Sequence, residues 1–319
     1  MPDVISYHDA EKRGELRSRS LLLGNGFSAN YCSYKNLLEH SGLAADTACR
    51  ILFDRLETAN FERIVRALED ASVVEAVYGH DAQSQALIAD AKTVREALVH
   101  AVRDTHPKHR DDIKEAIPSC IEFLAPFEKI FTLNYDLLLY WVIINSKQFG
   151  DGFYAAKDVD GFRGPFKVEP RCNVFNIHGG LHLFQREDGE IEKRLAGPDG
   201  GIDAIAQTIV EHNRFPVYVA EGTSGAKLRQ IRSSNYLNHC YEELKASRGQ
   251  FFIFGHSADE TDAHVYAALF TSKIDHLYFC IFDQTKLAEM DGRLSYYQKA
   301  NKSSIGYTFV DSKSVGVWD

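Results

Sequence analysis

The sequence predicts an α/β fold in which helices cover a mainly parallel, Rossmann-like sheet. Short apolar segments, rich in β-branched and aromatic residues, recur at wide spacing, and polar or helical sequence follows each of them. Strands that are apolar throughout are typical of parallel sheets, because helices cover both faces of such sheets. The predicted strands are residues 20–23, 129–133, 173–177, 216–220, 251–254, 277–282 and 307–310.

Residues 1–319 are expected to form one elaborated domain, since the sequence contains no internal repeat and no low-complexity linker. A helical insertion is predicted at about residues 40–127, between the first two strands. Within it, apolar residues recur at three- and four-residue spacing in 61–68 and 91–103. A β-hairpin is predicted in 181–195, where an Asp-Gly pair separates two alternating segments.

Composition and charge restrict the class of protein. The chain carries 36 Lys and Arg against 45 Asp and Glu, a formal net charge of −9, which argues against direct binding to nucleic acid. Its 45% hydrophobic content is that of a globular protein, and no apolar run approaches the roughly eighteen residues of a membrane span. Residues 1–20 lack the apolar run of a signal peptide, so a cytoplasmic protein is expected.

The cysteines indicate a reduced protein. Six of them are scattered along the chain, and no two form a C-x-x-C pair. Cys172 and Cys280 lie in apolar, strand-like segments, where a free thiol acts as a small hydrophobic side chain. We therefore expect neither a zinc ribbon nor another bound metal.

A glycine loop follows the first predicted strand. It reads Gly24-Asn25-Gly26-Phe27-Ser28 and, with the alanine after it, meets the relaxed G-x-G-x-x-A fingerprint of dinucleotide-binding proteins. Such glycines let the backbone approach a diphosphate, and the N–H groups at the start of the expected helix face the anion. The alternative is a tight strand–helix turn without a ligand, because the expected acidic ribose-binding residue is missing.

Two polar residues, Asn134 and Asp136, follow the second predicted strand. An amide both donates and accepts, so Asn134 could orient a ribose hydroxyl or a water molecule. The Asp136 carboxylate could accept from the backbone or from a sugar. Capping of the following helix is the alternative role for both side chains.

A histidine, His178, follows the third predicted strand and precedes two glycines. A histidine at this edge of the sheet suits proton transfer near neutral pH, and the glycines leave room for a sugar beside it. The alternative is an ordinary loop residue.

A second glycine turn follows the fifth predicted strand, and it reads Gly255-His256-Ser257. Ser257 could donate to a phosphate or a sugar, and Asp262, slightly further on, could cap a helix or bind a hydroxyl. The fourth predicted strand ends in a similar polar segment, residues 221–225.

Together these segments resemble, in order, four motifs of the SIR2-like family, which has the sirtuin type of NAD-binding fold. Residues 24–28 resemble its G-A-G-x-S loop, 132–136 its T-Q-N-x-D segment, 177–179 its catalytic L-H-G, and 255–257 its later G-T-S or G-Y-S loop. The four motifs together are far more specific than any one of them.

The departures from the sirtuin pattern point to one branch of this family. Sirtuin deacylases carry two C-x-x-C pairs after the catalytic histidine, whereas this chain has only Cys240 between His178 and Gly255, and Leu133 replaces the glutamine of the second motif. The sequence is more similar to bacterial SIR2-like proteins, including the DUF4917 group, several of which act as NAD hydrolases in antiviral defence. Phe61-Glu62 also resembles the F-E of that group.

The resemblance implies hydrolysis of NAD⁺ to nicotinamide and ADP-ribose, with NAD⁺ as substrate and no metal. His178 would be the general base or would polarise a ribose hydroxyl, Asn134 would position water or the ribose, and Asp136 would orient the ribose or the Asn134 loop. The implied NAD-binding residues are Gly24, Asn25, Gly26, Phe27, Ser28, Gly255, His256, Ser257 and Asp262.

Other functions stay open at this point. They are SIR2-type ADP-ribosyl transfer or deacylation, a non-catalytic NAD or ADP-ribose sensor that regulates a partner, and a hydride-transferring Rossmann dehydrogenase. A hydrolase that depletes NAD⁺ needs restraint, and the sequence has no P-loop. We therefore expect control by assembly into a homo-oligomer, by burial of the site under the helical insertion, or by a separate partner such as an ATPase.

Overall fold

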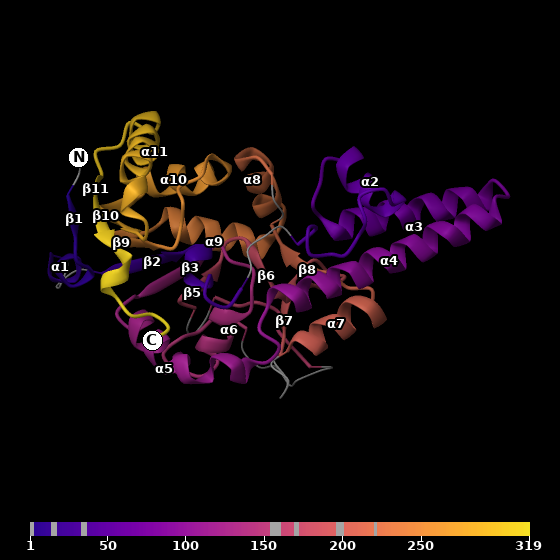
Figure 1. Ribbon diagram of the computed structural model, residues 1–319, viewed down its shortest axis with the longest axis horizontal. Coiled ribbons are helices and arrows are strands. Elements are labelled where there is room, and N and C mark those ends of the chain that lie inside the picture. The colour runs from indigo at the N-terminus through magenta and orange to yellow at the C-terminus, as the bar shows by residue number, and fades with distance from the viewer. Residues whose placement is uncertain are drawn as a thin grey trace.

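Figure 1 shows the computed structural model of the protein, which describes residues 3–13, 18–32, 37–153, 161–168, 172–195, 201–219 and 222–319. This part of the chain contains a seven-stranded parallel sheet, a four-stranded antiparallel sheet and the helices around them. The predicted α/β class with a mainly parallel, Rossmann-like sheet is confirmed by the strand pairing. The single-domain organisation stays a prediction.

The parallel sheet brings the carboxyl ends of its strands to one edge. Its strands, in spatial order, are β1 (Val4–Ile5), β11 (Gly306–Asp311), β10 (Lys273–Ile281), β9 (Arg248–Phe254), β2 (Arg19–Leu23), β3 (Lys129–Thr132) and β5 (Val174–Asn176). Six of them correspond to predicted strands, and the short edge strand β1 lies outside the predictions. The order places β2 between β9 and β3, so the loops after these three strands are neighbours.

The predicted strand at 216–220 does not join this sheet, which corrects the expected order. Its described part is β8 (Pro216–Tyr218), and Ala220 and Glu221 lie outside the described residues. β8 pairs antiparallel with β6 (Gly179–Gln185) in the small sheet, which also holds β7 (Ile191–Arg194) and β4 (Phe162–Arg163). Gly179, at φ +73°, lets the chain turn from β5 into this second sheet. The predicted hairpin in 181–195 is confirmed as β6 and β7.

Both faces of the parallel sheet are buried. Leu21 and Leu23 of β2 pack into one core, and Leu22 between them packs into the other. The first core includes α1 (Tyr7–Arg13), α5 (Ile117–Leu124), α6 (Leu138–Ile143) and α7 (Ile202–Glu211); the second includes α8 (Ser224–Ser233), α9 (Asn235–Lys245), α10 (Ala263–Phe270) and α11 (Leu287–Ala300). Each buried leucine contributes about 1.5–3 kcal/mol. These cores hold the strand ends in fixed positions.

Helices fill the chain between β2 and β3, as predicted for the insertion. They are α2 (Ala48–Arg55), α3 (Phe61–Val77), α4 (Asp81–Thr105), a 3-10 helix η2 (Arg110–Ala116) and α5. The Asn60 side chain caps α3 by accepting a backbone N–H, and Ile64 and Leu68 lie on its buried face. Gly79, at φ +83°, allows the turn into α4. The two long helices form a hairpin that projects from the body of the molecule (Figure 1).

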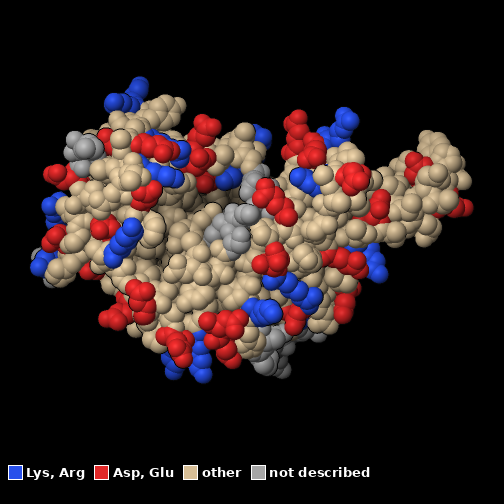
Figure 2. Space-filling model, in the orientation of Figure 1, with Lys and Arg blue, Asp and Glu red and all other residues tan. Residues whose placement is uncertain are grey.

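The outer end of this hairpin is acidic and partly apolar. Residues 67–91 contain no Lys or Arg, and Val73, Val74, Val77 and Tyr78 are exposed. In Figure 2 this end shows acidic side chains on a mainly uncharged surface. No helix in the described ranges is both long enough and apolar enough to cross a bilayer.

Candidate active site

The loops after β2 and β9 lie side by side at the carboxyl edge of the parallel sheet. The Gly24 N–H donates to Phe254 O at 2.9 Å, and the Gly26 N–H donates to Gly255 O at 2.7 Å. A Cβ on Gly26 would lie 2.6 Å from the Gly255 Cα, and Gly255 has φ +72°. The glycines are therefore needed where the two backbones touch, whether or not a ligand binds.

The helix expected after the first glycine loop is absent from the described residues 24–32, which corrects the prediction. Instead, η1 (Asn25–Phe27) is a single 3-10 turn. Phe27 is buried against Trp318, with ring centroids 4.9 Å apart. The Ser28 N–H donates to Asn25 O at 3.1 Å and closes a further turn of the backbone. The dipole of a long helix consequently does not point at this loop.

Two cavities flank the paired loops. The first, of about 670 Å³, is lined among others by Asn25, His178, Lys227 and Asp262, and the second, of about 460 Å³, by Gly26, Phe282, Asp283 and Arg293. Gly255, His256, Ser257 and Asp259 line both. Of the predicted site residues, Gly24, Phe27, Ser28, Asn134 and Asp136 line neither of them. The second glycine loop is therefore a wall that the two cavities share.

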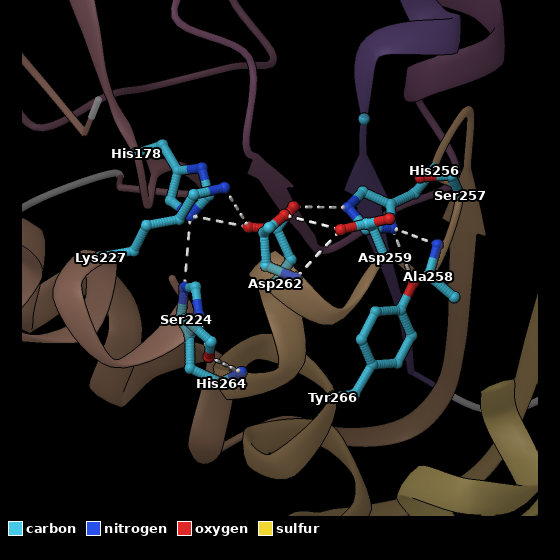
Figure 3. Close-up of polar contacts among 12 residues, drawn as sticks. His178, Ser224, Lys227, His256, Ser257, Ala258, Asp259, Asp262, His264 and Tyr266 are labelled. Atoms are coloured by element: carbon cyan, nitrogen blue, oxygen red, sulfur yellow. Dashed lines mark hydrogen bonds and ion pairs between the residues drawn. The ribbon is translucent and has the colours of Figure 1, made fainter. Parts of the chain in front are cut away.

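His178 lies in the turn between β5 and β6, beside the first cavity, and is only 5% exposed. Its Nε2 lies 3.3 Å from Nε2 of His264 and 3.8 Å from Oδ1 of Asp262. Both partners follow β9: Asp262 ends the 3-10 helix η3 (Glu260–Asp262), and His264 belongs to the first turn of α10. Figure 3 shows how these three side chains converge.

Asp262 is the centre of this buried polar cluster. Its Oδ1 accepts from the Lys227 Nζ at 2.8 Å, and its Oδ2 lies 3.2 Å from the His256 Nε2. The His256 Nδ1 accepts the Ala258 backbone N–H at 2.9 Å, so a neutral His256 carries its proton on Nε2 and donates it to Asp262. The carboxylate therefore receives hydrogen bonds on both oxygens.

Burial sets the protonation states of the cluster. It lowers the pKa of His178 to about 3, although the Asp262 carboxylate partly opposes the shift. It also lowers the pKa of His264, to about 4. Burial alone would raise the pKa of Asp262, but the His256 hydrogen bond and nearby positive charge, including the Lys227 ammonium, hold it below its ordinary value. At neutral pH, His178 and His264 are therefore neutral and Asp262 is ionised.

Asn134 lies in a separate buried network beneath the first glycine loop. Its Nδ2 donates to Gly24 O at 3.0 Å and to Ser28 Oγ at 3.1 Å. Its Oδ1 is buried and has no hydrogen-bond partner in the described part of the chain. This amide fixes the glycine loop from below, and the structure does not bring it into contact with His178.

Asp136 belongs to the same network. Its Oδ2 accepts from Ser28 Oγ at 2.8 Å, and its Oδ1 accepts the backbone N–H of Leu138, the first residue of α6, at 2.7 Å. This carboxylate therefore satisfies the first backbone N–H of α6, although Leu137 is the N-cap residue of that helix and provides no side-chain cap. Like Asn134, Asp136 supports the loop and does not face the first cavity.

Lys227 and His264 are functional candidates that the sequence analysis does not single out. Ser224 belongs to the predicted polar segment 221–225 but has no individual role there. Glu221 of that segment lies outside the described residues. Two signals were present in the sequence. His264 stands two residues after Asp262, and Ser224 and Lys227 have the i, i+3 spacing that places side chains on one helix face. Neither signal indicates that α8 and α10 meet beside His178.

Three cluster residues also have the donor atoms of a metal site. One atom each from His178, Asp262 and His264 lie within 4.8 Å of one another, and imidazole and carboxylate are common zinc ligands. However, the Lys227 ammonium already supplies a positive charge to Asp262. The expectation that no metal binds stays a prediction.

His178 is expected to stay neutral in an NMR titration from about pH 8 to about pH 5, because its pKa of about 3 lies far below the 6.5 of an exposed histidine. Between about pH 3 and about pH 6.5, His178 binds a proton in the unfolded chain but not in the folded chain. This residue therefore makes the free energy of unfolding fall as the pH is lowered through that range. The His178→Gln variant identifies the resonance. A midpoint near 6.5 would contradict the buried, neutral state.

The parallel sheet and the buried polar cluster at its carboxyl edge define an α/β protein of the Rossmann-like class. The chain belongs to the DUF4917 family: the family model described as "Domain of unknown function (DUF4917)" matches residues 21–318. The predicted membership of this family is confirmed. A comparison with curated proteins gave no match.

Solved structures that are similar to this chain include three Sir2 proteins. Sir2Tm bound to a propionylated peptide has 10% identity and a TM-score of 0.36, with 92% of this chain and 88% of that chain covered. A Sir2 homolog–NAD complex has 11% identity and a TM-score of 0.37, with 94% and 97% covered. A mutant Sir2 homologue in complex with 2'-O-acetyl ADP ribose has 12% identity and a TM-score of 0.38, with 93% and 98% covered.

Proposed function

We propose that the protein hydrolyses NAD⁺ to nicotinamide and ADP-ribose. The observation that supports this best is the position of His178, a buried and neutral imidazole that lines a cavity beside two paired glycine loops. A second cavity lies on the other side of the same loops. A ligand made of two nucleosides joined by a diphosphate would fill both cavities, with the diphosphate against the loops.

The chemistry of this reaction requires a base and a binding site for the ribose. Nicotinamide is cationic in NAD⁺ and leaves as a neutral molecule, so its departure needs no acid. The site has to hold the ribose while positive charge develops and to deliver water to the anomeric carbon. A neutral His178 accepts the proton that the water loses, and the Asp262 carboxylate, 3.8 Å away, stabilises the resulting imidazolium.

The other predicted residues divide into two groups in this proposal. Asn25 and Ser257 line the first cavity and would contact the nicotinamide riboside or the diphosphate, while Gly26 lines the second. Asn134 and Asp136 hold the first glycine loop in place. A hydrogen bond from Asn134 Nδ2 to the substrate would require this nitrogen to release Gly24 O or the Ser28 hydroxyl, whereas its Oδ1 has no partner among the described residues.

Chromatography of NAD⁺ incubated with the purified protein tests this function. Wild-type protein is expected to release nicotinamide, and His178→Ala to lower the rate by about 10²–10⁴-fold while NAD⁺ binding changes little, because the lost group acts as a base. Asn134→Ala is expected to weaken NAD⁺ binding, since the amide supports the loop. His276→Gln is the control, because this half-buried histidine contacts Thr308 and lines neither cavity.

Wild-type protein that binds NAD⁺ and releases no nicotinamide under any activating condition would rule out the hydrolase and favour the sensor. One observation supports the sensor as second candidate: Asn134 is engaged with Gly24 and Ser28 instead of facing His178. Transfer of ADP-ribose to a protein instead of water would appear as labelled protein in the same incubation.

We propose further that the hydrolase depletes NAD⁺ in antiphage defence, in the cytoplasm, under the control of a homo-oligomer or of a separate ATPase. The support is the family resemblance of the motifs together with the position of His178. Measurement of cellular NAD⁺ during phage infection, in cells that express the protein, tests this role. Size-exclusion chromatography with light scattering tests the assembly.

A further inference from the structure

A chain of hydrogen bonds leads from the first cavity to the start of α8. His178 Nε2 lies 3.3 Å from His264 Nε2, and His264 Nδ1 lies 3.0 Å from Ser224 Oγ. The two histidines are buried, whereas Ser224 is half-buried in the first turn of α8 and the residues on either side of it are exposed. Figure 3 shows the three side chains next to one another. The chain therefore connects a buried imidazole with the protein surface.

The direction of this chain is set by the hydrogen bond between His264 and Ser224. The His264 backbone N–H donates to Ser224 Oγ at 2.8 Å, and a hydroxyl oxygen accepts two hydrogen bonds and donates one. When the His264 Nδ1–H donates to the same oxygen, both of its lone pairs are used and its hydrogen is directed to solvent. His264 Nε2 is then the acceptor of the His178 Nε2–H. This arrangement leaves Nδ1 of His178 as the nitrogen that can take a proton.

We propose that His178, His264 and Ser224 form a proton relay that carries the proton of the attacking water out of the site. This inference rests on the proposed hydrolysis of NAD⁺. The water oxygen bonds to the anomeric carbon as the C–N bond breaks and its electron pair leaves with nicotinamide. The water proton passes to His178 Nδ1, the His178 Nε2 proton to His264 Nε2, and the His264 Nδ1 proton through Ser224 to solvent. One proton is released for each NAD⁺, and nothing is oxidised or reduced.

The surroundings of His178 explain why such an exit is useful. A substrate in the first cavity fills the space through which His178 reaches solvent. A buried imidazolium is costly to form. The Lys227 ammonium adds a positive charge near His178, and the Asp262 carboxylate adds a negative one. Transfer to His264 moves the proton away from the substrate and towards the half-buried Ser224.

Three variants test the relay by kinetics. His264→Gln keeps a hydrogen-bonding side chain that cannot pass a proton from one edge to the other, so it is expected to lower kcat by about 100-fold with NAD⁺ affinity within about threefold of wild type. Ser224→Ala is expected to lower kcat by about tenfold, and His276→Gln to leave it unchanged. Wild-type kcat in folded His264→Gln would overturn the relay. Should that variant fail to fold, wild-type kcat in Ser224→Ala would overturn it instead.

A second measurement does not depend on turnover. In ¹⁵N-histidine NMR of the wild-type protein near neutral pH, His178 is expected as the Nε2–H tautomer and His264 as the Nδ1–H tautomer. The reverse pair of tautomers would overturn the relay, as would stoichiometric zinc in the purified protein, because zinc would occupy the two Nε2 atoms. Failure of the proposed function is distinguishable, because it appears as absence of nicotinamide release from wild-type protein.

Discussion

Replacement of Asp262 by alanine is expected to lower the free energy of unfolding by about 3–5 kcal/mol, because it leaves a buried ammonium without its counter-ion. The side chains of Lys227 and Asp262 are only 12% and 13% exposed, and Nζ and Oδ1 lie 2.8 Å apart. His256 loses its acceptor in the same variant. Urea unfolding of the two proteins, followed by circular dichroism, measures the difference.

A surface ion pair is the matched control. Glu62→Ala removes an i, i+4 pair with Arg66 whose side chains are 46% and 72% exposed, and it is expected to cost less than about 0.5 kcal/mol. Adding Lys227→Met to Asp262→Ala should restore much of the lost stability, since the stranded charge is then gone. A loss in Asp262→Ala as small as that in Glu62→Ala would contradict a buried ion pair at this position.

Replacement of Gly255 by alanine is expected to lower the free energy of unfolding by about 2–5 kcal/mol, from backbone strain and overpacking together. Gly255 has φ +72°, and an added Cβ would lie 2.5 Å from the Phe27 N and 2.7 Å from the Gly26 C. These are backbone atoms, which cannot move aside as the end of a side chain can. Urea unfolding again gives the change, and weaker NAD⁺ binding should accompany it.

Gly79→Ala separates the two contributions. Gly79 has φ +83°, and an added Cβ would meet nothing within 4 Å, so only the backbone strain of about 1–2 kcal/mol is expected. If Gly255→Ala and Gly79→Ala lowered the free energy of unfolding equally, the added Cβ at Gly255 would cause no overpacking. That result would contradict the close packing of the two glycine loops.

The sequence alone predicts those strands and helices whose pattern lies within a few neighbouring residues. Leu21, Leu22 and Leu23 are all apolar because the two cores cover both faces of β2, and such a run indicates a buried strand whatever its neighbours are. The spacing of Ile64 and Leu68 likewise indicates a helix face. The placement of β8 could not be read in this way, since a three-residue strand carries no information about its partner.

The candidate site was predictable only in part, for a related reason. His178 was identified because it directly follows a strand, at an edge where ligands bind in such sheets. The glycines were also identified, but the sequence could not reveal that Gly26 and Gly255 touch each other. His264 was missed because its importance comes from a contact with a residue 86 positions away. The motifs therefore predict where the candidate site lies, whereas the contacts among its side chains come from tertiary packing.

The pairing of the two glycine loops also determines when the candidate site can form during synthesis of the chain. During translation, the loop after β2 leaves the ribosome long before the loop after β9 has been made. Until then, Gly24 and Gly26 lack their carbonyl partners, and His178 lacks both Asp262 and His264. A nascent chain of that length therefore lacks part of the lining of the first cavity and the polar partners of His178. In the proposed function, hydrolysis of NAD⁺ begins only after the loop after β9 and the start of α10 have folded.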